Sequence, residues 1–251
     1  MRKALQIAIA LVALGGSSSA AMAQNSGDDG RSITLTPYLW GTALEGTATI
    51  GNLPPADLDA SFGDIFDNLN GAMSLHIEFQ FDNWVFVVDP TYISLEIEAA
   101  LPPPIPAGTI LPIEVDIWLV EVWAGYRVHE NWEVFGGLRY QDQDISMSGL
   151  PSPPFPATSA GGGTNWTDGF IGARFNTDLS EKWFLTGRAD VVVAGDSESG
   201  WNASIMFNRR YANRKSLHIG YRYLDNEFDD PGVYGWDIAQ SGPVIGYTWT
   251  F

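Results

Sequence analysis

The strongest constraint on this chain is an alternation of apolar and polar residues with a period of two, which runs from Ile33 almost to the last residue. That period places successive side chains on opposite faces of a β-strand, whereas a helix repeats every 3.6 residues. Only Ser61 to Leu69 carries a short helix-like apolar stripe, with Ser61 as a candidate N-cap. The pattern therefore predicts an all-β chain.

Ten runs qualify as strands, and most exceed the roughly 9 to 11 residues that a tilted strand needs to cross a bilayer. They are Arg31 to Gly41, Ala72 to Phe81, Trp84 to Glu98, Ile113 to Val128, Trp132 to Ser148, Asn165 to Thr177, Trp183 to Gly195, Trp201 to Tyr211, Lys215 to Phe228 and Trp236 to Phe251. We expect an antiparallel, transmembrane, up-and-down β-barrel of about ten strands. Barrels of eight or twelve strands remain alternatives, because Thr47 to Gly51 could form a further strand.

The connections between these runs alternate in length. Short turns such as Asp82-Asn83 alternate with long connections at Thr42 to Gly71, Ala99 to Pro112 and Gly149 to Thr164, where most of the prolines lie. Outer-membrane barrels have short periplasmic turns and longer extracellular loops. This asymmetry predicts that the short turns face the periplasm.

The short turns provide a test of which residues face outward. A shift of one residue in the strand pairing would move the apolar side chains of a strand to the other face of the sheet. Met73 to Phe81 and Trp84 to Tyr92 keep one apolar face through Asp82-Asn83, and three other hairpins do the same. Eight of the ten tryptophans fall at two levels, near the turns or near the loops. A soluble β-sandwich would also alternate, but two aromatic girdles favour a barrel that faces lipid.

Composition excludes several classes of protein. The chain has 13 Lys and Arg against 30 Asp and Glu, a formal charge of -17, which disfavours nucleic acid as a partner. It has no cysteine, so neither disulfides nor thiolate chemistry are available.

The first segment has the order of a secretory signal peptide. Arg2 and Lys3 precede the apolar stretch Ala4 to Leu14, and Ala21-Met22-Ala23 forms an A-x-A cleavage site. We expect residues 1–23 to be removed on export and residues 24–251 to form one barrel domain.

The last residues carry the most specific motif. Gly246, Tyr247, Trp249 and Phe251 combine a glycine with alternating aromatic residues. This segment resembles the C-terminal signal of Gram-negative outer-membrane proteins, which implies recognition by the barrel-assembly machinery. With Pro37 to Trp40 and Gly220 to Tyr223, the chain resembles small outer-membrane barrels of the OmpA/OmpW-like kind, including members of uncharacterised function. The resemblance implies a barrel in the outer membrane, surrounded by lipid and lipopolysaccharide, for which we expect a monomer.

Positions of the opposite parity should line the lumen. They include a set of charges of both signs, namely Asp89, Glu121, Arg139, Arg188, Asp190 and Arg222. Glu121 falls opposite Arg139 through the turn at His129 to Asn131, which predicts a cross-strand ion pair. The set could be a charged constriction that selects solutes or a packed polar core, and small barrels favour the packed core.

The sequence offers little for catalysis or for a cofactor. His76, His129 and His218 all fall toward the short turns, and no Ser or Asp partner for them is evident at the outer rim. They come from separate strands without the spacing of metal ligands. We therefore expect no enzyme, metal or cofactor. Acidic residues of the loops, such as Asp57, Asp59, Asp225 and Asp229, could share divalent cations with lipopolysaccharide or form a solvated surface.

The leading hypothesis is a structural barrel or a narrow channel for small solutes. The alternative is a surface binding or adhesion module that acts through its long loops.

Overall fold

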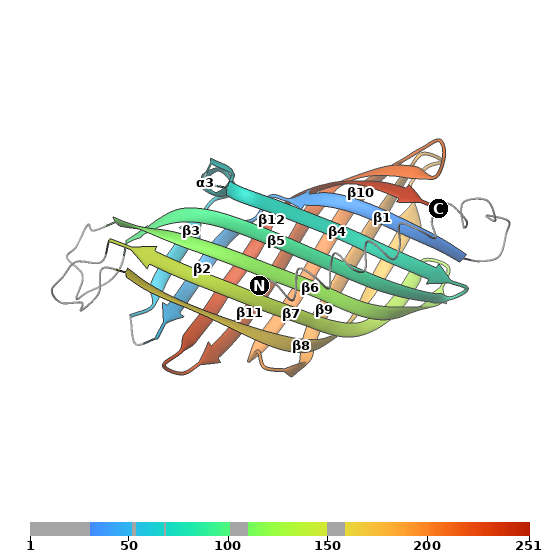
Figure 1. The fold of residues 1–251 in the computed structure, drawn as a ribbon. Helices are drawn as coiled ribbons and strands as arrows, with labels where there is room; N and C mark the ends of the chain where they lie inside the picture. The colour runs from blue at the N-terminus through green and yellow to red at the C-terminus, as the bar shows by residue number, and fades with distance from the viewer. Residues whose placement is uncertain (1–30, 52–53, 68, 101–109, 150–158) are drawn as a thin grey trace, which may run out of the picture.

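The computed structural model describes residues 31–51, 54–67, 69–100, 110–149 and 159–251, which form one elongated barrel (Figure 1). The expected signal peptide and the Pro-rich tips of two long connections lie outside these residues. In the part of the chain that the structure describes, no helix is long and apolar enough to span a membrane.

All the long elements are antiparallel strands. In chain order they are β1 (Arg31–Trp40), β2 (Ala43–Ile50), β3 (Ala56–Ala60), β4 (Leu69–Phe81), β5 (Trp84–Ala100), β6 (Ile110–His129), β7 (Trp132–Ser148), β8 (Ser159–Asp178), β9 (Trp183–Gly195), β10 (Ser199–Tyr211), β11 (Lys215–Asp230) and β12 (Tyr234–Thr250). The end of the barrel that carries the β4–β5, β6–β7, β8–β9 and β10–β11 connections is called the turn end, and the other is called the loop end. The turn end lies at the right of Figure 1.

Twelve strand segments make ten positions in the barrel wall, which confirms the predicted strand number. β1 and β2 both pair with β12, one after the other, so together they form a single wall strand. β4 pairs with β1 and β3 pairs with β2, so β3 and β4 form the next one. The predicted long loop at Thr42 to Gly71 is therefore largely wall, because β2 and β3 continue the ladder beyond a break.

A short helix, α3 (Phe62–Asp67), lies at this break in the wall. The Ser61 hydroxyl accepts a hydrogen bond from the Asp64 amide, and Asp64 in turn accepts bonds from the Ser61 amide and hydroxyl, which caps the helix. A Cβ at Gly41 would lie 2.3 Å from the Phe62 ring, so the glycine makes room for the helix. Figure 1 shows α3 at the edge of the barrel, not across its lumen.

A belt of exposed apolar side chains surrounds the turn-end half of the barrel. Its members have the parity that the hairpins predicted, and they include Met73, Phe79, Trp84, Phe86, Val122, Tyr126, Trp132, Leu138, Ile171, Trp183, Ile205, Phe207, Ile219, Tyr221, Ile245 and Trp249. Tryptophans at positions 84, 132, 183 and 249 lie at the edge of the belt nearest the turns, where one of the two aromatic girdles was predicted.

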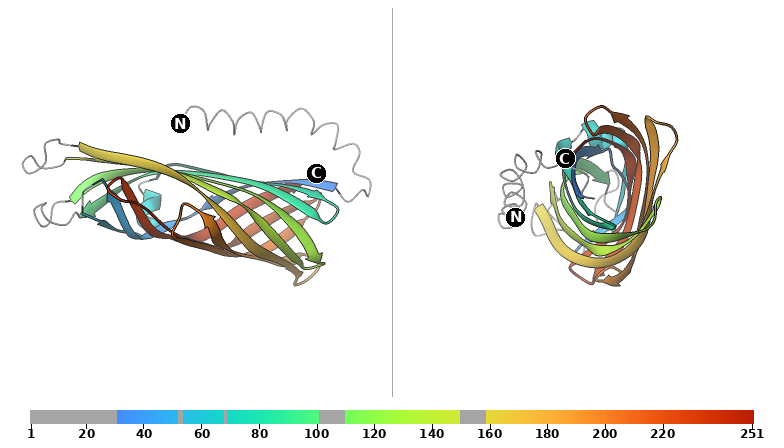
Figure 2. Two further views of the ribbon diagram at one scale, coloured as in Figure 1. Left: turned by 90° about the horizontal axis from the view of Figure 1, so that it is seen from below. Right: turned by 90° about the vertical axis from the view of Figure 1, so that its right-hand side faces the viewer.

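The loop-end half has the opposite polarity. Its interior is a dry apolar core that includes Leu95, Ile113, Val115, Ile117, Ile145, Ile238 and Trp236. The prediction of an aromatic girdle near the loops is only partly correct. Trp201 faces outward, but Trp166 and Trp236 point inward and are 2% and 1% exposed. Trp166 instead stacks on Phe228 inside the core, with ring centroids 4.5 Å apart. The end view in Figure 2 shows the flattened cross-section that brings the facing walls together.

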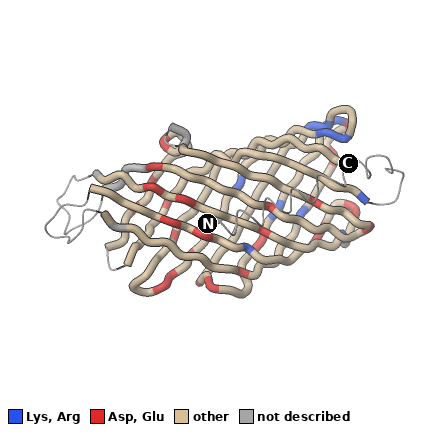
Figure 3. The backbone as a smooth tube through the Cα atoms, in the orientation of Figure 1, with Lys and Arg blue, Asp and Glu red and all other residues tan. Residues whose placement is uncertain are grey.

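Acidic and basic side chains are also distributed differently between the loop end and the turn end. Outward positions of the loop end carry acidic side chains, among them Glu45, Asp57, Asp59, Glu96, Glu114, Asp144 and Asp237. The Lys and Arg residues of the described chain lie in the lumen or near the turn end, as the blue segments of Figure 3 show.

Candidate functional site

The lumen narrows at a layer of ionised side chains near the middle of the barrel. This charged layer consists of Glu121, Arg139, Arg188, Asp190, Arg222 and the amide of Asn202, all buried or nearly so. They come from β6, β7, β9, β10 and β11, and each stands on the inward parity of its strand. Five of the six predicted lumen charges are therefore brought together here.

Glu121 is the centre of the charged layer. It is the direct cross-strand neighbour of Arg139, as predicted, and their side chains approach to 2.7 Å. Its second oxygen lies 2.8 Å from Arg188 and 3.3 Å from Arg222. One carboxylate thus serves three guanidinium groups.

Asp190 closes the network from β9, two strands along the wall from β7. It lies 2.6 Å from Arg139 and 2.8 Å from Arg188, and Asn202 donates to it at 2.7 Å. Asn202 in turn accepts a hydrogen bond from Arg222 at 3.0 Å. Three arginines face two carboxylates, so the layer is formally cationic by one charge.

Aromatic rings surround these arginines. The Arg139 guanidinium lies 4.9 Å from the Phe170 centroid, and that of Arg222 lies 4.6 Å from Trp40. Such contacts favour cations and exclude water from the layer. The charged layer is a packed unit.

Asp89, the sixth predicted residue, is the direct cross-strand neighbour of Glu121, and its side-chain contacts begin a second network that leads toward the turn end. It accepts a hydrogen bond from the Tyr38 hydroxyl at 2.7 Å and contacts His76 Nδ1 at 2.8 Å. Beyond His76, the carboxylate of Glu78 binds Arg174 at 2.6 Å. Arg174 also binds Glu133 at 2.8 Å, which extends the chain of contacts toward the turn end.

The charged layer is sealed on the side of the loop end. Arg139, Gln141, Gln143 and Asp168 are each 0% exposed, and the apolar core follows directly above them. On the side of the turn end, by contrast, a cavity of about 410 Å³ lies below the layer. Its lining runs from Arg188 and Arg222 to turn-end residues such as Glu130, Asn131 and Trp132. We call this cavity the vestibule.

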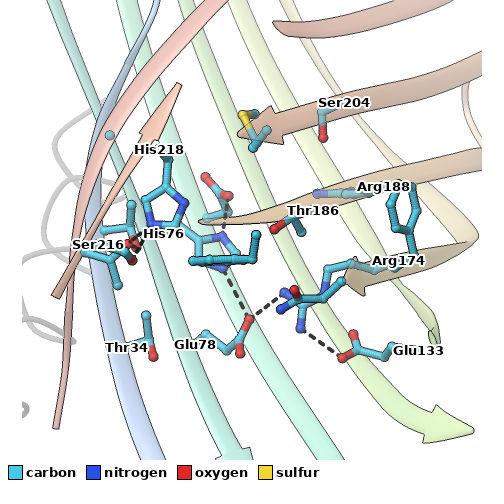
Figure 4. A pocket seen from close by; sticks show the side chains of 18 of the residues that line it. Thr34, His76, Glu78, Glu133, Arg174, Thr186, Arg188, Ser204, Ser216 and His218 are labelled. Carbon is cyan, nitrogen blue, oxygen red and sulfur yellow. Dashed lines mark hydrogen bonds and ion pairs between the residues drawn. The ribbon is translucent and has the colours of Figure 1, made fainter. Parts of the chain in front are cut away.

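A third group of polar side chains lies on the wall of the vestibule. His218 of β11 contacts the Ser216 hydroxyl through Nε2 at 3.0 Å and the Asn208 amide oxygen through Nδ1. Asn208 is buried behind the histidine, whereas Ser216 and His218 line the vestibule. Figure 4 shows Ser216 and His218 beside His76, with Glu78, Arg174 and Glu133 lining the same cavity from other strands.

Sequence reasoning missed this group because it searched for partners only at the outer rim. A usable signal was present: Ser216 and His218 are two residues apart and so share a face, and Asn208 lies opposite His218 across the short β10–β11 turn. His129 lies apart from them, at the β6–β7 turn. Within the described residues no group of three or more His, Cys, Asp or Glu side chains has the arrangement of a metal site.

The predicted C-terminal motif closes the barrel. Gly246 faces inward opposite Tyr38, and a Cβ there would lie 2.9 Å from the Tyr38 Cβ. Tyr247 and Trp249 make an edge contact, with centroids 4.9 Å apart. Phe251 exchanges two backbone hydrogen bonds with Ile33, of 2.8 and 3.3 Å.

Comparison with solved structures places this architecture in a known class. The crystal structure of the outer-membrane protease OmpT from Escherichia coli matches with a TM-score of 0.56 and 9% identity, over 88% of this chain and 97% of that one. The translocator domain of the autotransporter NalP from Neisseria meningitidis matches with a TM-score of 0.48 and 14% identity, over 98% of each chain. Ail, the attachment invasion locus protein of Yersinia pestis, matches with a TM-score of 0.39 and 10% identity, over 89% of this chain and all of that one.

The fold is that of the outer-membrane β-barrel proteins, a closed, ten-stranded, antiparallel barrel. No family model matches the sequence, and no curated protein matches it either. The likeness at such low identity concerns the fold, and function has to be argued from the lumen.

Proposed function

We propose that this protein is a structural barrel of the Gram-negative outer membrane whose lumen is blind. In this proposal the vestibule opens toward the periplasm, and the charged layer with the apolar core above it keeps the lumen closed to solutes. Lipid contacts the belt, and the acidic loop end projects into the lipopolysaccharide layer.

The observation that carries the proposal is the burial of the middle of the lumen. Arg139, Gln141, Gln143 and Asp168 are all inaccessible to water, although water-filled pores of larger barrels keep such inward residues exposed. Their side chains and the core that includes Ile117 and Trp236 fill the cross-section. A conducting path through the middle of the barrel would require these packed groups to move apart.

Single-channel recording in planar bilayers tests this proposal. The refolded protein, verified by its heat-modifiable mobility, should insert without discrete open steps. A wide general porin, reconstituted in the same way, provides the positive control for insertion and detection. Reproducible ion-selective steps from the folded barrel would contradict a closed lumen and favour the narrow channel.

The orientation can be tested separately, because the chain has no cysteine of its own. Single cysteines at Ser146, an exposed outward position near the loop end, and at Asn213, in the β10–β11 turn, give two matched reporters. A membrane-impermeant maleimide should label Ser146→Cys on intact cells, and Asn213→Cys only after permeabilisation. The reverse pattern would mean that the vestibule faces outward.

The acidic exterior of the loop end favours a second candidate function, binding at the cell surface. Outward carboxylates such as Asp57, Asp59 and Glu114 face solvent, and the basic residues of the described chain lie elsewhere. A cationic protein or divalent cations shared with lipopolysaccharide would complement such a surface. Salt-dependent binding of a polycationic probe, lost when these carboxylates are replaced by amides, would support it.

A further inference from the structure

The vestibule contains an arrangement that a purely structural lumen does not need. Ser216, His218 and Asn208 are connected in series, with the serine and the histidine on the cavity wall and the asparagine buried behind them. A hydroxyl nucleophile, a base within hydrogen-bond reach and a third group that orients the base form the general arrangement of nucleophilic catalysis.

The hydrogen bonds of Asn208 determine which histidine nitrogen carries the proton. The Asn208 amide nitrogen donates to the Thr186 hydroxyl at 2.7 Å and to the Met206 carbonyl at 3.1 Å. A carbonyl can only accept, so the nitrogen faces Met206 and the amide oxygen faces His218. His218 Nδ1 must then donate to that oxygen, which leaves Nε2 as an acceptor that the Ser216 and Thr248 hydroxyls share.

This tautomer is the one that general-base catalysis requires. Nε2 lies 3.0 Å from Ser216 Oγ, within the reach of a proton transfer. The Thr248 hydroxyl also contacts Nε2, and it has a second partner in the Thr36 hydroxyl at 2.6 Å. Ser216 makes its side-chain hydrogen bond to His218 and is one of the residues that line the vestibule.

We propose that Ser216, His218 and Asn208 form a serine-hydrolase triad that cleaves small, water-soluble carboxylic esters in the vestibule. This inference depends on an accessible vestibule and not on whether the upper lumen conducts. Ser216 and His218 have inward parity, opposite to the lipid-facing belt, so membrane lipids in the bilayer plane do not reach them. A cavity of about 410 Å³ limits the substrate to a small molecule.

The reaction balances without a further reactant other than water. Ser216 Oγ attacks the ester carbonyl carbon while its proton passes to His218 Nε2, and the protonated Nε2 then donates that proton to the leaving alkoxide as the C–O bond breaks. Water attacks the resulting acyl-serine, loses its proton to Nε2, and the proton returns to Ser216 Oγ as the acid is released. Once Nε2 has taken the serine proton it no longer accepts from Thr248, so the Thr248 hydroxyl beside it becomes a donor available for the carbonyl oxygen as it becomes negative.

The charged side chains near the triad are paired with one another. Figure 4 places His76 next to His218, and His76 is held by Asp89 and faces Glu78 on its other side. Arg174 and Arg188 line the same cavity, and each binds two carboxylates. The negative charge that develops on a bound ester would therefore be stabilised by hydroxyl donors beside His218.

The first test is covalent labelling, because it does not depend on the natural substrate. The folded barrel is incubated with a small fluorophosphonate probe, and peptide mass spectrometry locates the adduct. We expect modification of Ser216, prevented in Ser216→Ala and in His218→Gln. Ser204→Ala removes a different hydroxyl from the same cavity wall and should leave the labelling unchanged.

The second test is hydrolysis of p-nitrophenyl acetate and p-nitrophenyl butyrate by the same proteins. Ser216→Ala retains every histidine, so it separates triad catalysis from general imidazole catalysis. Its rate should fall to the background level, and Asn208→Ala should lose on the order of 10²- to 10⁴-fold, as for the loss of an orienting group in serine proteases. Heat-modifiable mobility confirms that each variant is folded.

The inference is overturned if the folded parent protein gives no adduct on Ser216, or if Ser216→Ala hydrolyses both esters as fast as the parent. In either case the three residues only hold β10 and β11 together. The conductance experiment is unaffected by that result, so the closed-lumen proposal would stand or fall by itself.

Discussion

Along β6, Val115 points into the barrel and Val122 points out of it, yet both are removed from water. Val115 is 0% exposed in the apolar core of the loop end, whereas Val122 is 40% exposed on the belt. Between them, near Trp118 and Leu119, the apolar face of the strand changes sides. The loop end is organised like a soluble protein, with an apolar interior and an acidic exterior, and the turn end is organised like a membrane protein.

This difference shows that two properties of a strand are independent: which residues share a face, and which of the two faces is apolar. Strand geometry determines only that alternate residues share a face, and the medium outside determines which face is apolar. Where lipid surrounds the barrel, charges such as Glu121 and Arg139 are placed inside and must be paired. Where water surrounds it, Glu114 and Asp116 face outward and the interior is dry. Four substitutions test this comparison.

The largest effect should follow from Glu121→Gln in the turn-end half. Three arginines would then share the single carboxylate of Asp190 in a buried layer. Breaking a buried ion pair from one side costs about 3 to 5 kcal/mol. Urea unfolding of the refolded barrel should show a loss of this size.

Glu114→Gln, on the exposed outer face of the same strand, is the matched control and should change stability by less than about 0.5 kcal/mol. The double variant Glu121→Gln with Arg139→Gln should recover part of the loss. Equal stability of Glu121→Gln and the parent would mean that the charged layer is hydrated.

Next in size is Ile117→Ala in the dry core of the loop end. Ile117 is 2% exposed, and removing its side chain leaves a cavity among packed neighbours. Such changes cost about 2 to 5 kcal/mol. Ile219→Ala on the lipid-facing belt should cost clearly less in the same unfolding assay, because lipid can fill the space. Similar losses at both sites would contradict the division into a packed interior and a fluid exterior.

The boundary between the halves can be located on β7 by inserting a charge. Leu138 and Ser146 face outward on the same strand, Leu138 on the belt and Ser146 near the loop end. Leu138→Arg should lose about 2 to 4 kcal/mol, as charges do near the bilayer midplane. Ser146→Arg should be nearly neutral in the same assay. If both arginines are tolerated equally, the belt ends closer to the turns than Leu138.

The smallest effect concerns α3, at the level where the two wall strands are interrupted. Hydrogen bonds from the Ser61 hydroxyl and backbone hold the pKa of the Asp64 carboxyl below its usual value. A depressed pKa in the folded state means that the contribution of this cap is present above the ordinary aspartate range and is lost as the pH falls through the folded-state pKa. Ser61→Ala should raise the pKa of Asp64 in an NMR titration and leave global unfolding unchanged. Ser146→Ala is the control, and an unchanged Asp64 pKa in Ser61→Ala would show that the cap does not form in solution.

The sequence predicted the parts of this molecule that depend on strand parity. The strand number, the belt around Phe86 and Leu138, and the contact of Glu121 with Arg139 all follow from alternation carried across short turns. Parity does not reveal depth along the barrel or the level at which polarity changes sides. For that reason Trp166 and Trp236, placed by level alone, were expected in a girdle and lie in the core.

Contacts between distant strands were also beyond prediction. Arg139 on β7 reaches Asp190 on β9 over the intervening strand β8, a contact that the register of a single hairpin does not predict. β3 was missed as a wall strand, and β2 was anticipated only in part, as the alternative strand Thr47 to Gly51, because the break at Gly41 and α3 resembles the beginning of a loop. Ser216, His218 and Asn208 could have been found from one hairpin register, since all three are local to β10 and β11.

The pairing of β1 with β12 has a consequence for the time course of folding. Thr34 and Thr250 face each other across this junction although 216 residues separate them in the chain. Hairpins such as β6–β7 can form from neighbouring residues at small entropic cost, but the junction requires the two most distant segments to meet. By loop-closure entropy this junction is the costliest pairing of the barrel to form, and until it forms both edge strands present unpaired backbone groups. A partner that shields these edges, or supplies a temporary strand to them, would accelerate folding most at this one junction.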